Sequence, residues 1–411
     1  MKVLLISISA PPQNTPESLQ VIKYANQLAS RCDLTLLTIK EADGWRKADV
    51  SLKDAIRPAR IVRLPHYSSK VGRFLSGILN RNWLMKPDED FMFPVQWKRA
   101  VKKIKHKPDI LYSRSTPYSS ALMGLKLKQY YKVPWVLHLS DPWLLSPLNS
   151  FTGELQAYHR QAELKCFESA DVITLTSQEQ LALYRKHYPR LAHKFHFYPN
   201  VYNDDEVTDN PITFNGRLTF LHTGNFYGEG RNPVFLLEAI QKVIQRDPTF
   251  VNDCEFVFIG RLNADVHAVF KKYNYPFVKV IEDYTFTQVV QSQRNAHILL
   301  LFDWKFRESS SVFFLSKILG YMTSQRPILA ITGRNSTCWS VIEERYGRCF
   351  EHDNTAGIAD YLLDALKSFR TKNSNFFTVA QPDPAYSARN NADRLYALFE
   401  SLLQPTLPEA K

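Results

Sequence analysis

The stretch from His297 to Ile331, HILLLFDWKFRESSSVFFLSKILGYMTSQRPILAI, carries the clearest signals of fold and chemistry in the chain. Ile298 to Phe302 is a short, uninterrupted apolar run, which predicts a strand buried on both faces, and Ile328 to Ile331 predicts another. The loop between them ends in three serines at positions 309–311, and we expect these to cap a helix that begins near Val312. The stretch therefore predicts the order strand, loop, helix, strand.

The start of this predicted helix is a candidate anion site, because its free N–H groups and partial positive charge attract anions. Lys317 is expected about one and a half turns into the helix, within reach of a bound phosphate. Glu308 lies just before the cap, where its carboxylate can accept a hydrogen bond from a hydroxyl group. The alternative is an ordinary capped helix that carries a lysine.

Apolar strands alternate with helical stretches in both halves of the chain, which is typical of doubly wound parallel sheets. The pattern breaks at a polar segment, YPNVYNDDEVTDNP, that begins at Tyr198, and it starts again with a strand near Leu218. We therefore expect one domain over residues 1–203 and a second over residues 204–384, followed by a helix from Ala388 to Leu403.

The composition supports an ordinary globular protein of 411 residues, with 45% hydrophobic and 22% charged residues. Glycine occurs only 14 times, so a glycine-rich phosphate loop cannot be assumed. The five cysteines are scattered without metal-ligand spacing, which favours free thiols in a reducing compartment and gives no support for a metal site. The start, MKVLLISISAPP, is too short for a signal peptide, and we expect it to form the first strand of a cytoplasmic protein.

Most of the net positive charge lies between Arg46 and Lys107, where sixteen Lys and Arg accompany five Asp and Glu; the whole chain has a net charge of +12. The segment VGRFLSGILNRNWLMK places apolar residues at helical spacing beside Arg73 and Arg81. Residues 46–107 suit an anionic membrane surface, although a solvated face and a nucleic-acid surface stay open. Because no nucleic-acid-binding motif occurs, we expect no nucleic acid partner.

A glycine turn follows the first predicted strand of the second half, in His222-Thr223-Gly224-Asn225, and Arg231 comes a few residues later. Glycine permits close approach of a phosphate to the backbone. Together with Lys317, this gives two cations and a glycine turn at one edge of the sheet, which suits a diphosphate leaving group. The loop after the first strand of the chain, SAPPQNTPES, lacks such glycines.

Several of these stretches carry a family resemblance. LHTGNFYGEGRNPVFLLEAI, EFVFIGRL and SVFFLSKILGYMTSQRPILAI resemble the donor half of GT-B glycosyltransferases of the family 4 type, which act on bacterial surface polysaccharides. MKVLLIS and PDILYSRSTPYSSALMGLKLKQYYKVPWVLHLSDPW resemble the acceptor half. The resemblance implies an α/β GT-B fold, with two Rossmann-like, doubly wound domains that face each other across a cleft. It also implies that residues 385–411 pack back on the first domain.

From the resemblance we expect a retaining, hexosyltransferase-like enzyme without a metal or other cofactor. It would move a sugar from a nucleotide-diphosphate donor to a lipid-linked saccharide acceptor in capsule, O-antigen or exopolysaccharide biosynthesis. Residues 46–107 would hold it peripherally at the inner face of the cell membrane. A sugar-nucleotide epimerase and a non-catalytic homologue that serves as a partner or scaffold are the alternatives.

The donor site departs from the family pattern. Val312 and Gly320 stand at the positions that match two glutamates of the family, and Asn225 stands where arginine is frequent. Arg231 replaces the usual lysine. The candidate donor-binding residues are Gly224, Asn225, Arg231, Glu308, Ser310, Ser311 and Lys317.

The candidate catalytic residues are Asp141 and His138, because VLHLSDPW ends a predicted strand whose tip carries ligands in this type of fold. Either side chain can orient the sugar or receive the acceptor proton, and the resemblance favours Asp141. In retaining enzymes of this type the departing phosphate itself accepts that proton. The run Asp88-Glu89-Asp90 matches a metal-binding DxD signature, but its position between Pro87 and Phe91 predicts a solvated loop.

Overall fold

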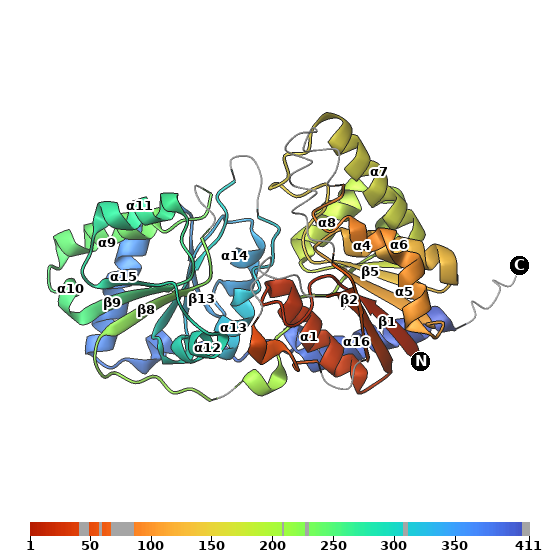
Figure 1. Cartoon of the computed structure of the whole chain (residues 1–411). Helices are drawn as coiled ribbons and strands as arrows, with labels where there is room; N and C mark the ends of the chain where they lie inside the picture. Colours follow the sequence, from red (N-terminus) through yellow and green to blue (C-terminus); the bar gives the residue numbers. More distant parts are fainter. Residues whose placement is uncertain are drawn as a thin grey trace, which may run out of the picture. The chain divides into compact units, whose positions relative to one another are not determined.

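The computed structural model describes residues 1–40, 49–56, 60–66, 86–207, 209–226, 230–306 and 311–404 (Figure 1). The chain divides into two compact units, Met1–Asn203 with Ala385–Lys411, and Asp204–Pro384. Each unit contains one parallel sheet with helices, as the alternation of strands and helices predicts. Across the described ranges, no helix is both long enough and apolar enough to cross a membrane.

The first unit is built on a seven-stranded sheet in the order β3-β2-β1-β4-β5-β6-β7. Its strands are β1 (Lys2–Ile6), β2 (Asp33–Ile39), β3 (Arg60–Leu64), β4 (Ile110–Ser115), β5 (Trp135–Leu139), β6 (Val172–Leu175) and β7 (Phe195–Phe197). Its helices are α1 (Pro16–Ala29), α4 (Met92–Val95), α5 (Trp97–Ile104), α6 (Ser119–Tyr131), α7 (Gly153–Ser169), α8 (Gln178–His187) and α16 (Ala388–Leu403). The strand order reverses between β1 and β4, and ligands bind at such switch points in open parallel sheets.

Two apolar layers cover the faces of this sheet. Leu4 and Ile6 of β1 lie in a layer with residues of α5, α6, α7 and α8. The intervening residue Leu5 lies in the opposite layer, with residues of α1 and α16 such as Phe399. Because successive side chains of a strand point to opposite faces, a strand covered on both sides reads as a continuous apolar run.

The second unit is built on a six-stranded sheet in the order β10-β9-β8-β11-β12-β13. Its strands are β8 (Leu218–Thr223), β9 (Cys254–Ile259), β10 (Val278–Ile281), β11 (Ile298–Phe302), β12 (Ile328–Ile331) and β13 (Gly347–Phe350). Its helices are α9 (Val234–Arg246), α10 (Phe250–Asp253), α11 (Ala264–Tyr273), α12 (Phe286–Asn295), α13 (Lys317–Thr323), α14 (Thr337–Ile342) and α15 (Thr355–Arg370). The switch point of this sheet lies between β8 and β11.

The helix expected to begin near Val312 begins later, so this prediction is wrong. Lys317 is the first residue of α13, and the preceding Ser316 makes no capping hydrogen bond with its side chain. Ser311 does not cap the helix either, because its hydroxyl donates to Asp303 Oδ1 at 3.0 Å. Phe313 and Phe314 bury their rings in the stretch without regular structure that precedes α13.

In the run Asp88-Glu89-Asp90, Glu89 is exposed as a solvated loop predicts, but the prediction is wrong for the two aspartates. Asp88 accepts hydrogen bonds from the backbone N–H and the hydroxyl of Ser119, at 2.8 and 2.6 Å, and burial raises its pKa to about 6. Asp90 is 3% exposed and lies 3.3 Å from His66 Nε2. The run therefore caps the first residue of α6. In the part of the chain that the structure describes, no cluster of three His, Cys, Asp or Glu is placed to hold a metal ion.

Candidate functional site

Two glycines bring the loops after β8 and β9 into contact. Gly224 has a φ of +112°, a conformation that favours glycine, and its N–H donates to Ile259 O at 2.8 Å. A Cβ atom on Gly260 would lie only 2.2 Å from Gly224 O. The two backbones are therefore in direct contact, which fixes the loop at the carboxyl end of the central strand β8.

Lys317 lies against this glycine loop. A Cβ atom on Gly224 would be 2.9 Å from Lys317 Nζ, and the same Nζ is 3.4 Å from His222 Nε2. His222 Nδ1 lies 2.9 Å from Leu300 O, so it donates there, and Nε2 is left to accept from the lysine. Phe226 stacks on the imidazole with ring centroids 4.6 Å apart. Strand, glycine and aromatic ring thus hold the lysine head group in one place.

The electrostatics of this cluster favour an anion. The pKa of Lys317 is lowered well below its usual value, mainly by burial and to a lesser degree by the nearby positive charge of Arg231. Burial, followed by Lys317, lowers the pKa of His222 in the same way. Arg231 is itself only 6% exposed. Two cationic side chains therefore share a site in which Arg231 is buried and Lys317 half-buried, and a bound anion would relieve their repulsion.

The other predicted donor-binding residues have different positions. Asn225 is exposed, and its Oδ1 accepts a hydrogen bond from Arg261 N at 3.0 Å, which ties the two glycine loops together. Ser311 is bonded to Asp303 and does not line a helix start. Glu308 and Ser310 lie outside the described residues. The structure thus brings Gly224, Arg231 and Lys317 to one place, whereas Ser311 serves the loop that follows β11.

Sequence reasoning missed Asp303, which directly follows β11 and is 1% exposed. Its Oδ1 accepts from Trp304 N at 2.8 Å as well as from Ser311, and its Oδ2 accepts from Thr332 Oγ1 at 2.9 Å. The carboxylate therefore joins the loops that follow β11 and β12. The signal in the sequence was an acidic residue directly after a buried apolar strand.

Tyr321 was missed as well. Its hydroxyl accepts from Thr223 N at 3.1 Å and donates to Leu300 O at 3.1 Å. Gln293 also donates to the hydroxyl of Thr223, at 2.8 Å. These bonds anchor the end of β8 next to Gly224, so Tyr321 helps to fix the position of the glycine loop.

In the first unit, Asp141 and His138 differ in accessibility. His138 is fully buried in β5, its Nδ1 lies 3.0 Å from Thr174 Oγ1, and burial lowers its pKa well below the usual value. Asp141 follows β5 and is exposed, with a hydrogen bond from Thr116 Oγ1 at 3.4 Å. Desolvation by the surrounding protein is the main reason that the pKa of Asp141 is raised to about 6, and the negative charge of Glu17 adds to it. Accessibility therefore favours Asp141 for contact with a substrate.

A buried ion pair fixes the loop that carries Asp141. Arg114 Nε donates to Glu17 Oε1 at 2.7 Å, and its Nη1 donates to Tyr112 Oη at 2.8 Å. The hydroxyl of Ser140 donates to the other oxygen of Glu17. The first turn of α1 and the strand β4 therefore meet at this loop.

A second buried carboxylate, Glu163 of α7, anchors the same loop further along. It accepts hydrogen bonds from Leu144 N at 3.0 Å, from Tyr184 Oη at 3.1 Å and from the hydroxyl of Tyr188. Burial is the main reason that its pKa is raised to about 7, since the hydrogen bonds act in the opposite direction. The loop is thus attached through a group that titrates near neutral pH.

We expect Glu163→Gln to remove a pH-dependent part of the stability. A carboxyl group whose pKa is raised on folding contributes stability that is complete below its ordinary value of 4.5 and is lost as the pH rises through about 7. The raised pKa corresponds to roughly 3 kcal/mol. Denaturant titrations at about pH 5 and about pH 8 should therefore show a larger loss in the wild type than in Glu163→Gln. Glu168→Gln, an exposed change on the same helix, should behave like the wild type; equal losses in all three proteins would contradict the prediction.

No protein-family model and no curated protein matches the chain. Solved structures do match. The N-terminal domain of trehalose-6-phosphate phosphatase from Candida albicans is 12% identical, with a TM-score of 0.67 over 97% of this chain and 96% of that one. The UDP-forming α,α-trehalose-phosphate synthase from Burkholderia xenovorans is 11% identical, with a TM-score of 0.64 over 97% and 99%. HepE from Anabaena in complex with UDP is 14% identical, with a TM-score of 0.61 over 98% and 100%. These likenesses are of fold, and they confirm the predicted GT-B fold class.

Proposed function

We propose that the chain is a glycosyltransferase that moves a sugar from a nucleotide-diphosphate donor to a saccharide acceptor. The observation that carries this proposal is the cluster of Lys317 and Arg231 at the glycine loop of Gly224. A diphosphate fits there because its negative charges can pair with both cations. The fold neighbour HepE, which was crystallised with UDP and with UDP-glucose, supports a nucleotide sugar as the ligand.

In this proposal the residues of the chain divide the work. Lys317 and Arg231 stabilise the charge that develops on the departing diphosphate, and Gly224 lets its oxygens approach the backbone. The departing phosphate accepts the proton of the acceptor hydroxyl, so the reaction retains the sugar configuration, and Asp141 orients the sugar. Because two side chains supply the positive charge, we infer that the transfer needs no metal or other cofactor.

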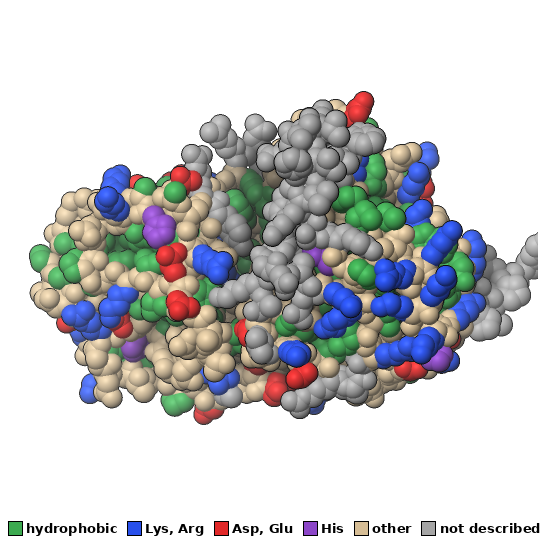
Figure 2. Space-filling model, in the orientation of Figure 1, with side chains coloured by type: hydrophobic (Ala, Val, Ile, Leu, Met, Phe, Trp, Pro, Cys, Tyr) green, Lys and Arg blue, Asp and Glu red, His purple; other side chains and the backbone are tan. Residues whose placement is uncertain are grey.

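We further propose a lipid-linked saccharide as the acceptor, in surface polysaccharide assembly at the inner face of the cell membrane. Part of the basic segment supports a peripheral membrane contact, although Arg73 and Arg81 lie outside the described residues. Lys and Arg side chains gather on the side of the first unit around α5 (Figure 2). The exposed cations of this surface are Lys98, Arg99, Lys102, Lys105 and Lys107.

Apolar groups accompany these cations. Val95 is 63% exposed and Tyr130 is 53% exposed, and the Tyr130 ring lies 5.6 Å from that of Trp97. Such exposed apolar groups can enter the membrane interface while the lysines contact the lipid head groups. This pairing favours a membrane over a merely solvated face.

We expect Lys98→Gln with Lys102→Gln to weaken binding to anionic lipid vesicles. Each cation near such a surface contributes about 1 kcal/mol, so the pair should cost roughly 30-fold in partitioning at low salt. Sedimentation with vesicles that contain phosphatidylserine measures this. Lys367→Gln, an exposed lysine of the second unit, is the matched control. Equal binding of the wild type to neutral and anionic vesicles would count against the membrane contact.

A thermal-shift screen with UDP-, GDP- and CDP-sugars, without added metal, tests the donor proposal. A ligand at about a hundred times its Kd adds about 2.7 kcal/mol to the stability, which is readily detected. A shift with one nucleotide class supports the donor site and identifies the base. No shift with any nucleotide sugar would favour the non-catalytic homologue, and conversion of the sugar without an acceptor would favour the epimerase.

A further inference from the structure

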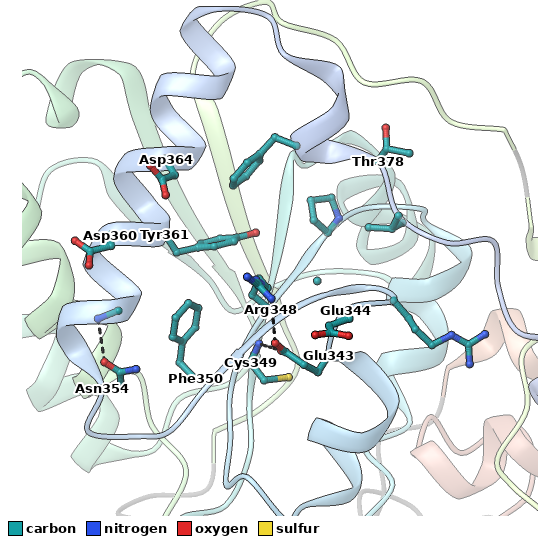
Figure 3. A pocket seen from close by; sticks show the side chains of 16 residues that line it. Glu343, Glu344, Arg348, Cys349, Phe350, Asn354, Asp360, Tyr361, Asp364 and Thr378 are labelled. Atoms are coloured by element: carbon teal, nitrogen blue, oxygen red, sulfur yellow. Dashed lines mark hydrogen bonds and ion pairs between the residues drawn. The ribbon is translucent and has the colours of Figure 1, made fainter.

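A pocket of about 840 Å³ lies in the second unit, along the outer edge of β13 (Figure 3). Its lining comes from α15, from residues 343–350 and from residues 376–379. Neither Lys317 nor Arg231 nor Gly224 lines this pocket. Its volume falls in the range of about 300–1,000 Å³ that is usual for small-molecule sites. The pocket is therefore a second candidate site with its own chemistry.

The strand edge in this pocket is not open to a peptide. β13 is the last strand of the sheet, and such an edge normally invites pairing with another strand. Here the Glu343 carboxylate accepts a hydrogen bond from Cys349 N at 2.6 Å, and Glu344 N donates to Gly347 O at 3.2 Å. These bonds occupy backbone groups that an added strand would need. The occupant must therefore be recognised by side chains.

Aromatic rings form one wall of the pocket. The ring of Tyr361, from α15, lies 5.9 Å from that of Phe350 and 5.4 Å from that of Phe376. The hydroxyl of Tyr361 points toward the middle of the pocket (Figure 3). Burial raises the pKa of Tyr361, so the hydroxyl stays protonated and can both donate and accept. Such a wall suits a ligand with apolar C–H faces and hydroxyl groups at its rim.

The charged groups of the pocket exclude a phosphate ligand. Two arginines line the pocket and both are paired, Arg345 with Asp383 at 2.8 Å and Arg348 with Glu343 at 3.3 Å. Asp364 and Glu344 are exposed, and neither forms an ion pair within the described part of the chain. The excess charge is thus negative, which repels an anion. Carboxylates and a guanidinium group instead suit adjacent hydroxyls, to which they form paired hydrogen bonds.

We propose that this pocket binds a neutral saccharide. A sugar ring would pack against the aromatic wall at Tyr361, and its hydroxyls would bond to Asp364, Glu344 and Arg348. A neutral polyol is the class of ligand that offers apolar faces together with closely spaced hydroxyls and no charge. The site goes beyond the proposed transfer reaction, since it would hold part of a longer saccharide away from the donor site at Gly224, Arg231 and Lys317.

Saturation-transfer NMR on the full chain, without nucleotide, tests this proposal with maltotriose, cellotriose and chitotriose as probes. We expect at least one of them to bind with a Kd below ~10 mM. Asp364→Asn and Tyr361→Phe keep the shape of their side chains and should each weaken this binding at least fivefold. Lys367→Ala, on an exposed position of α15, is the control and should leave it unchanged.

The outcomes separate this site from the donor site. Lys317→Ala should keep the saccharide signal while it loses the nucleotide sugar, whereas Asp364→Asn should do the reverse. Absence of any signal at ~10 mM for all three probes would overturn the proposal. Equal affinity in the wild type, Asp364→Asn and Tyr361→Phe, with all three folded by thermal unfolding, would overturn it as well.

Discussion

Lys317→Ala and Arg231→Ala are each expected to weaken nucleotide-sugar binding at least ~30-fold, because removal of one partner from a buried charge contact costs about 2–5 kcal/mol. Arg231 is 6% exposed and Lys317 is half-buried against Gly224, so an anion at this site has limited water to compensate for a lost cation. Isothermal titration with the nucleotide sugar that the thermal screen selects measures the loss. The double variant should bind below detection.

Replacement of Lys317 by an uncharged residue is expected to have the opposite effect on the stability of the free protein, which makes the test sharper. Burial and Arg231 hold the pKa of Lys317 down, so the lysine destabilises the unliganded site. Lys317→Met should therefore raise the melting temperature without ligand and abolish the shift with ligand. Lys367→Ala, an exposed lysine of the same unit, should change neither. Wild-type affinity in Lys317→Ala would refute the donor site.

Gly260→Ala is expected to destabilise the second unit by about 3 kcal/mol, because the added methyl group overpacks a closed junction. The new Cβ would meet Gly224 O at 2.2 Å, and a backbone atom cannot rotate away as a side chain can. Urea titration of the free energy of unfolding, with a probe in the second unit, measures the change. The nucleotide affinity should fall too, since the Gly224 loop must move.

Gly333→Ala is the matched control for this prediction. A Cβ at Gly333 meets nothing within 4 Å, and the residue lies in the same unit, after β12. Its stability should stay within about 0.5 kcal/mol of the wild type. If Gly260→Ala unfolds at the same urea concentration as Gly333→Ala, the two loops are not in contact.

The parts of the fold that could be predicted are those in which burial alone decides the structure. The strands Ile298–Phe302 and Ile328–Ile331 and the C-terminal helix Ala388–Leu403 were expected with the bounds that the structure has. β7 and β13 were not expected, because three or four residues with polar members at a sheet edge give no periodic signal. Their pairing is decided by the neighbouring strand.

The candidate site shows the same division. Gly224 could be singled out because it follows a recognisable strand, and Lys317 because it lies in a recognisable helical stretch, although it begins α13 and does not lie one and a half turns into it. The cap proposed for Ser311 failed because its hydroxyl is bonded to Asp303, a contact that depends on the path of the loop. The ion pair of Arg114 and Glu17 could not be predicted from the sequence, because it depends on the order of the strands in the sheet.

The C-terminal helix has a consequence for the order in which the protein folds during synthesis. The second unit is one continuous segment, so it can close as soon as Pro384 has left the ribosome. The first unit is discontinuous, because its apolar layer under α1 is completed by Leu395 and Phe399 of α16. Until those last residues emerge, the apolar layer that contains Val21 and Tyr24 remains incomplete on the nascent chain. The part that is translated first is therefore the part that matures last.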